Sequence, residues 1–95
     1  MQYLNEHQKR LWKSMLKSIE DFRNGNIAYC NMVGELEGAL DASDINNKEV
    51  SERWYDYWIP LEIERATKGN CVESADVEIF INNLEKFIND TTGLK

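Results

Sequence analysis

The residues that could support nucleophilic or metal chemistry are few and widely separated in this chain. His7 is the only histidine, and Cys30 and Cys71 are the only cysteines. A metal site needs several ligands that converge, and a catalytic nucleophile needs a base beside it and a third group that orients the base. No second soft ligand lies within one helical turn of His7. We therefore expect no catalytic residues, no metal and no cofactor, because an enzyme would need a distant partner for His7.

The carboxylates do not form an acid–base pair or a calcium loop either. Glu35 and Glu37 are two residues apart, as are Glu62 and Glu64, and residues at this spacing point in different directions on a helix. The loop at 41–46 has oxygen ligands but lacks the Asp-x-Asp-x-Asp-Gly pattern of a calcium site. A loop that is solvated and caps a helix is the simpler interpretation.

The distribution of charge indicates binding rather than catalysis. The net charge is −6, which argues against nucleic-acid binding, because that function requires a basic surface. Residues 24–47 contain no Lys or Arg and carry a net charge of −4. We expect an acidic surface here that attracts a basic protein partner, with an ordinary solubility surface as the alternative. Its carboxylates are Glu35, Glu37, Asp41 and Asp44.

An aromatic cluster follows this acidic block, in the run from Trp54 to Trp58. At about 100° per residue, Tyr57 lies with the two tryptophans on one side of a helix, which predicts that all three are buried. Tyr55 lies to one side and is followed four residues later by Ile59. This pair either forms an exposed contact ridge or packs under the first or fourth helix, and the small size of the domain favours packing.

These observations define a predicted surface for binding a partner. It combines carboxylates, which attract a basic protein, with a tyrosine, a residue type that is enriched at binding hot spots. Asp56 is included because it lies beside the tyrosine in the sequence. The predicted partner-binding residues are Glu35, Glu37, Asp41, Asp44, Tyr55 and Asp56.

Four amphipathic segments must position these side chains. Apolar residues recur at three- and four-residue steps over about residues 4–23, 27–42, 48–68 and 74–90, separated by short polar breaks. Ninety-five residues are enough for one core, so we expect a single helical domain over residues 1–95. The fold class is all-α, an antiparallel bundle of four helices, with the third helix kinked or broken at Pro60.

Several local features accompany this fold prediction. Gly34 and Gly38 lie on one flank of the second helix, which suggests that a neighbouring backbone or ring packs closely there. The second helical segment is followed by a polar loop that leads to the aromatic third helix. Asn46, in this loop, is the expected N-cap of the third helix. Ser74 is the expected cap of the fourth helix, and Gly25 the turn residue that ends the first.

The predicted location is the cytoplasm. No apolar run approaches the roughly 18 residues of a membrane span, and the N-terminal residues lack the apolar stretch of a signal peptide. Cys30 and Cys71 are too few for a disulfide framework, so we expect small buried side chains in a reducing compartment.

Residues 33–66 resemble a pattern in small bacterial all-helical proteins. The stretch from Gly34 to Ala42 contains a Leu-Glu-x-x-Leu motif, and the segment after it contains Trp54 and the sequence from Trp58 to Glu62. In size, acidity and layout the chain is similar to the helical immunity proteins of contact-dependent-inhibition and other polymorphic-toxin systems. Pro60 departs from the uninterrupted helix that this pattern implies.

The resemblance implies a bacterial inhibitor that binds a cognate toxin, commonly a nuclease, and covers its active site or substrate surface. The family has no catalytic residues to transfer to this chain. An alternative from another class is a structural or regulatory helical module that self-associates, for example as a homodimer that buries Tyr55 and Ile59.

Overall fold

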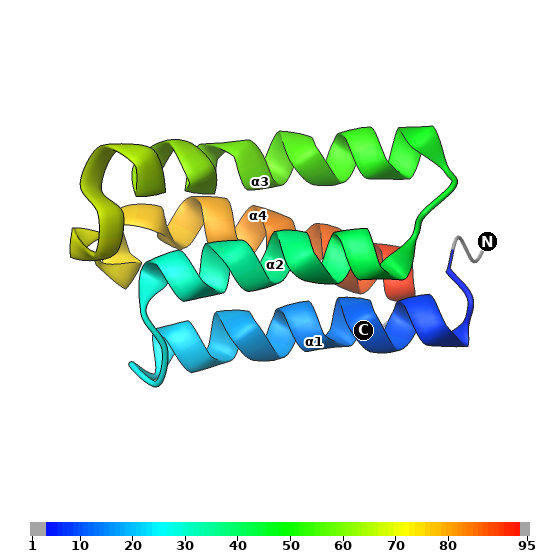
Figure 1. The fold of residues 1–95 in the computed structure, drawn as a ribbon, viewed down its shortest axis with the longest axis horizontal. Helices are drawn as coiled ribbons and strands as arrows, with labels where there is room; N and C mark the ends of the chain where they lie inside the picture. The colour runs from blue at the N-terminus through cyan, green and yellow to red at the C-terminus, as the bar shows by residue number, and fades with distance from the viewer. Residues whose placement is uncertain (1–3, 94–95) are drawn as a thin grey trace.

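The computed structural model describes residues 4–93, and this part of the chain forms a bundle of helices without a strand (Figure 1). Successive α-helices run antiparallel to one another, as the sequence predicts. A short 3-10 helix lies between the third and fourth of them. The elements are α1 (Glu6–Arg23), α2 (Tyr29–Ser43), α3 (Lys48–Lys68), η1 (Gly69–Cys71) and α4 (Ser74–Thr92).

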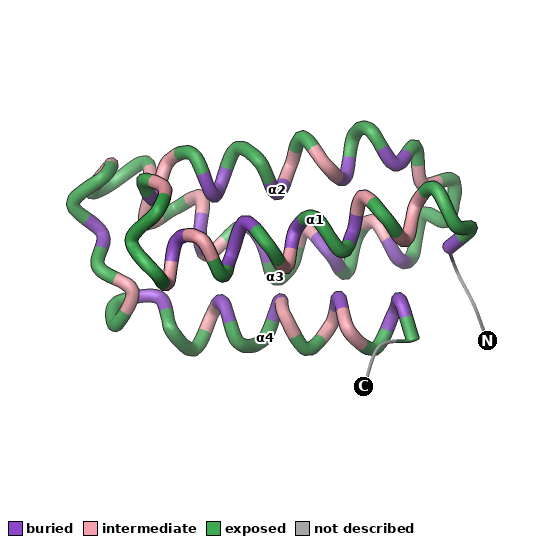
Figure 2. Tube along the Cα trace, turned by 90° about the horizontal axis from the view of Figure 1, so that it is seen from below, coloured by how far each residue is buried: buried purple, intermediate pink, exposed green. Residues whose placement is uncertain are grey.

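The four α-helices pack in a closed ring. α1 contacts α2 and α4, and α3 contacts the same two helices from the other side. The buried residues recur along each helix at the spacing of an amphipathic stripe (Figure 2). Because α2 and α3 are neighbours, the acidic block and the aromatic cluster lie side by side.

The helix ends agree with the sequence to within a residue or two. Gly25, with φ of 77°, follows the end of α1 as predicted. Asn47 rather than Asn46 caps α3, because its side chain accepts the Val50 N–H at 3.1 Å. Glu73 caps α4, and Ser74 is already its first residue.

Pro60 does not break α3, which is continuous from Lys48 to Lys68. Proline lacks the N–H that would bond the Asp56 carbonyl. The buried side chains of Trp58 and Leu61 flank it and hold the helix against the core on both sides. A kink at this point stays a prediction.

Three buried tryptophans form the centre of the core, on α1 and α3. A buried indole N–H needs an acceptor, and here each one finds its acceptor on another helix at 3.2 or 3.3 Å. These hydrogen bonds therefore fix the positions of the helices relative to one another along the bundle axis. The acceptors are Ser43 Oγ for Trp12, Met15 Sδ for Trp54 and the Val33 carbonyl for Trp58.

Three side chains that the sequence predicts to be buried are partly or largely exposed in the structure. Tyr57 is 37% exposed, because one side of its ring packs against Phe87 of α4 and the other faces an open pocket. Cys30 is half-buried and Cys71 is exposed. Both cysteines lie at the end of the bundle, in the first turn of α2 and in η1, where fewer helices surround them.

The predicted close approach at Gly34 and Gly38 is wrong. Both glycines lie on the exposed side of α2, and a Cβ atom built on either would meet nothing within 4 Å. Ala42, one turn further along, is exposed as well. The outer ridge of α2 is therefore bare of large side chains.

Alanine at either glycine should stabilise the fold. Gly34→Ala and Gly38→Ala each remove backbone freedom from the unfolded chain without a clash, so each should raise the free energy of unfolding by about 0.5–1 kcal/mol. Urea denaturation of both variants measures this. Loss of stability in either would mean that the ridge is packed after all.

Tyr29 links α2 to α3 inside the core. Its buried hydroxyl donates to the Leu61 carbonyl at 2.7 Å. Burial, followed by the negative charges of Glu64 and Glu62, raises the pKa of the Tyr29 hydroxyl far above its ordinary value. The folded protein therefore holds this proton more tightly than the unfolded chain does.

Stability should fall as the pH rises above about 10, since the unfolded chain then loses the Tyr29 proton while the folded protein keeps it. Tyr29→Phe should cost about 1 kcal/mol near neutral pH, from the lost hydrogen bond, and should flatten this alkaline decline. Urea denaturation at several pH values tests both effects. An equally steep decline in the variant would contradict the role assigned to Tyr29.

Candidate functional site

Tyr55 lies at the boundary between α2 and α3, half-buried rather than fully exposed or fully in the core. Its ring stands edge-on to Trp54 and Trp58, at centroid distances of 5.1 and 5.7 Å. Its hydroxyl donates to Glu37 Oε2 at 3.3 Å. Packing by the two tryptophans therefore fixes the ring and leaves the hydroxyl at the surface of α2.

Asp41 and Asp44 lie beside this tyrosine and line a small pocket of about 150 Å³, which we call the acidic pocket. Partial burial, and then the charges of Glu37 and Asp41, raise the pKa of Tyr55. The phenol thus remains a neutral hydrogen-bond donor within a negative field. The pocket is lined by Leu40, Asp41, Asp44, Ile45, Ser51 and Tyr55.

These carboxylates have no counter-ion of their own. Within residues 4–93, no Lys or Arg nitrogen lies within 4.0 Å of a carboxylate oxygen of Glu37, Asp41 or Asp44. Some other carboxylates are paired: Arg65, for example, pairs with Glu62 and thereby lowers the pKa of that carboxyl. The negative potential of the acidic pocket is therefore available to a partner.

The end of α2 helps to form this pocket. Asp44 is the C-cap and adopts a left-handed conformation, with φ of 50° and ψ of 53°. Its N–H donates to the Asp41 carbonyl at 3.2 Å. Aspartate tolerates this conformation better than most residues do, and the tight turn brings its carboxylate back beside Asp41.

Two of the predicted partner-binding residues lie elsewhere. Glu35 faces the groove between α1 and α2, where it accepts a hydrogen bond from Ser18 Oγ at 2.7 Å. Lys17 and Asp21 of α1 line the same groove and pair with each other. Asp56 is exposed on α3, and no hydrogen bond or ion pair with another described residue involves its side chain. The structure therefore groups Glu37, Asp41, Asp44 and Tyr55.

An exposed apolar pair lies on α3. The sequence singles out its first member, Ile59, together with Tyr55 as a possible contact ridge, whereas its second member, Ile63, is not predicted. Ile59 and Ile63 are 45% and 59% exposed and lie one turn apart on α3. Their spacing of four residues, outside the buried stripe of Trp54, Trp58 and Leu61, is a signal that could have identified them. Ile59 and Ile63 follow Tyr55 by one and two turns of α3, so exposed aliphatic side chains continue along the helix that carries this tyrosine.

The candidate metal ligands do not gather in space. No group of three or more His, Cys, Asp or Glu side chains in the described part of the chain could hold a metal ion. His7 is exposed in the first turn of α1. Among the described helices, none has the length and apolar character needed to cross a membrane.

Comparison with known proteins identifies no family. No protein-family model matches the chain, and neither the curated proteins nor the solved structures give a match. The features of the chain that bear on function are therefore the acidic pocket, the exposed apolar pair and the sequence resemblance at residues 33–66.

Proposed function

We propose that this chain is a bacterial immunity protein that acts in the cytoplasm against a cognate toxin of contact-dependent inhibition or a related system. It binds a basic surface of the toxin, which we take to be a nuclease, and covers its active or substrate-binding site. The observation that carries the proposal is the acidic pocket, whose carboxylates lack counter-ions. The resemblance of residues 33–66 to helical immunity proteins supports it independently.

The carboxylates take the place of nucleic-acid phosphates in this proposal. Asp41 and Asp44 attract the cationic groups with which a nuclease holds its substrate. The Leu40 and Ile45 side chains of the pocket accommodate the apolar stem of a lysine or arginine, whose charged end then reaches the two carboxylates. Tyr55, already fixed by packing, adds aromatic contact area at little cost in side-chain entropy.

The bare ridge of α2 also suits this task. Glycine at positions 34 and 38 gives up helix stability without relieving a clash. A partner backbone can approach the ridge closely because no Cβ atom stands in the way. Retaining these glycines is consistent with a surface selected for contact rather than for stability.

Asp41→Lys should weaken inhibition mainly by slowing association. Reversal of one charge at the centre of the acidic pocket should lower the association rate about tenfold at low ionic strength, with a smaller effect at high salt. The proposal requires a large secreted protein encoded immediately upstream, and surface plasmon resonance with the C-terminal domain of that protein measures this rate. Asp44→Asn is the companion variant, because asparagine tolerates the left-handed backbone.

Asp90→Lys is the matched control, since it makes the same change in charge on α4, which lies diagonally across from α2. Its association rate should stay within about twofold of wild type at moderate salt, where the Debye length is about 10 Å. Equal rates for Asp41→Lys and Asp90→Lys would remove the steering mechanism. Failure of the wild-type chain to protect cells that express the toxin domain would remove the proposed function itself.

The second candidate is a module that self-associates through α3. The exposed pair Ile59 and Ile63 favours it, because a copy of the chain could bury both side chains. Sedimentation velocity at several concentrations should then show a dimer that Ile59→Asp and Ile63→Asp abolish. Ile79→Asp, at an exposed isoleucine of α4, should leave the dimer intact. A wild-type chain that stays monomeric at all concentrations would exclude this candidate.

A further inference from the structure

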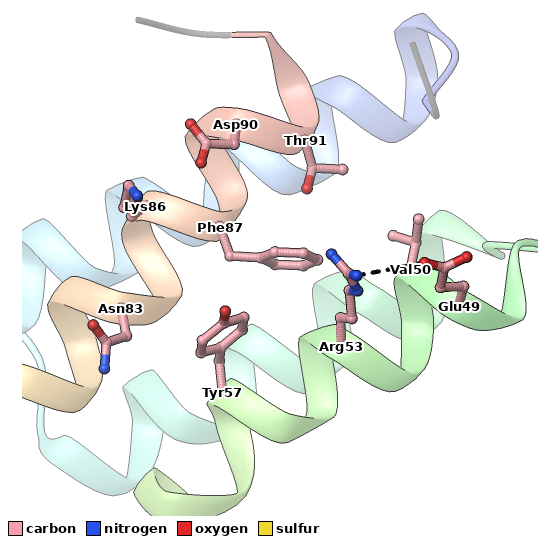
Figure 3. A pocket seen from close by; sticks show the side chains of 9 residues that line it. All are labelled: Glu49, Val50, Arg53, Tyr57, Asn83, Lys86, Phe87, Asp90 and Thr91. Carbon is pink, nitrogen blue, oxygen red and sulfur yellow. Dashed lines mark ion pairs between the residues drawn. The ribbon is translucent and has the colours of Figure 1, made fainter. Parts of the chain in front are cut away.

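A second pocket, of about 380 Å³, lies between α3 and α4 (Figure 3). Its size is within the range of small-molecule sites. It is separate from the acidic pocket, because Tyr55 contacts Glu37 of α2 whereas Tyr57 packs on Phe87 of α4. The two tyrosines are two residues apart and so face opposite sides of α3.

Two aromatic rings form the apolar part of the α3–α4 pocket. Tyr57 and Phe87 have a centroid distance of 5.2 Å and an interplanar angle of 36°, and Figure 3 shows the two rings close together at the pocket. Tyr57 is left 37% exposed, in a small bundle that has reason to bury every large side chain. A flat apolar group would cover the side of the Tyr57 ring that faces the pocket and contact Phe87 beside it.

Thr91 supplies a hydroxyl at the wall of the pocket that has no hydrogen-bond partner among the described residues. The residue is only 7% exposed, yet its hydroxyl makes no hydrogen bond with any residue from 4 to 93. The neighbouring Thr92 hydroxyl, by contrast, donates to the Ile88 carbonyl at 2.8 Å. Thr91 lines the pocket, and Figure 3 shows its side chain directed toward the gap between Phe87 and Arg53. A hydroxyl at the wall of an open pocket can exchange water for a polar group of a ligand.

Arg53 is the charged group nearest the rings in Figure 3. Its guanidinium pairs with Glu49 at 3.6 Å, but both side chains are largely exposed, so this pair is weak and easily exchanged. Asp90 also lines the pocket, but in Figure 3 its carboxylate turns away from the two rings. Arginine binds a planar carboxylate through two parallel hydrogen bonds, which makes an anion the matching ligand group.

We propose that the α3–α4 pocket binds a small aromatic carboxylate. The aromatic body covers Tyr57 and Phe87, and the carboxylate replaces Glu49 as the partner of Arg53 while it accepts a hydrogen bond from Thr91. The site lies apart from the proposed toxin surface and does not depend on it. It would give the domain a ligand-binding function of its own.

The test uses 2-naphthoate as the probe and 2-naphthalenemethanol, which has the same rings and no charge, as its comparison. In amide NMR titrations of the full chain, 2-naphthoate should give saturable shifts at residues 49–57 and 83–91. Its affinity should exceed that of the alcohol by about tenfold, the contribution of one charge-assisted contact. Shifts that do not saturate, or that spread evenly over the bundle, would overturn the proposal.

Three variants assign the contacts. Arg53→Gln should weaken 2-naphthoate binding about tenfold and leave 2-naphthalenemethanol unaffected. Thr91→Val should weaken 2-naphthoate binding several-fold without lowering the melting temperature, because it removes a hydroxyl that has no partner. Lys48→Gln is the control: it removes a cation from a similar ion pair on α3, with Glu52 at 3.8 Å, but does not line the pocket. Equal binding by Arg53→Gln and Lys48→Gln would show that Arg53 does not hold the carboxylate.

Discussion

The buried tryptophans impose the main constraint on this bundle. An indole ring supplies much of the apolar area that a domain of this size needs, but its N–H must find an acceptor once water is excluded. Here each acceptor belongs to a different helix from the ring that uses it. Trp12 of α1 reaches α2, Trp54 of α3 reaches α1, and Trp58 of α3 reaches α2. Hydrophobic packing alone would allow the helices to slide along one another. These hydrogen bonds select one position along the bundle axis for each pair of helices.

This constraint also positions the surface of α3. Trp54 and Trp58 anchor the helix so that Tyr55 and Tyr57 emerge on opposite sides, toward α2 and α4 respectively. Each tyrosine then forms part of one pocket, acidic on the α2 side and lined by both acidic and basic side chains on the α4 side. One rigid helix thus supports two surfaces of different chemistry, and continuity of α3 through Pro60 keeps them in a fixed relation.

The sequence predicts what depends on periodicity and predicts less well what depends on the distance between helices. Trp12, Met15 and Ile19 of α1 repeat at helical spacing, and all are buried as this pattern indicates. The same periodicity places Tyr57 with the tryptophans, but it cannot show that α3 and α4 leave a pocket between them. In the same way, net charge identifies the acidic block of residues 24–47 without showing that Glu35 faces α1 whereas Glu37 faces α3.

Several positions carry residues that stabilise the fold less than another residue would. The outer glycines of α2 and the exposed isoleucines of α3 each contribute less stability than another residue would at the same position. A domain of about one hundred residues has only a few kcal/mol to lose, so such features persist most readily where they have a use. The glycines lie within the acidic block of α2, and Ile59 follows Tyr55 by one turn on α3, whereas the exposed Ile79 lies apart from them on α4. Most of these local conflicts between sequence and stability therefore lie on α2 and α3, the helices that carry the acidic pocket.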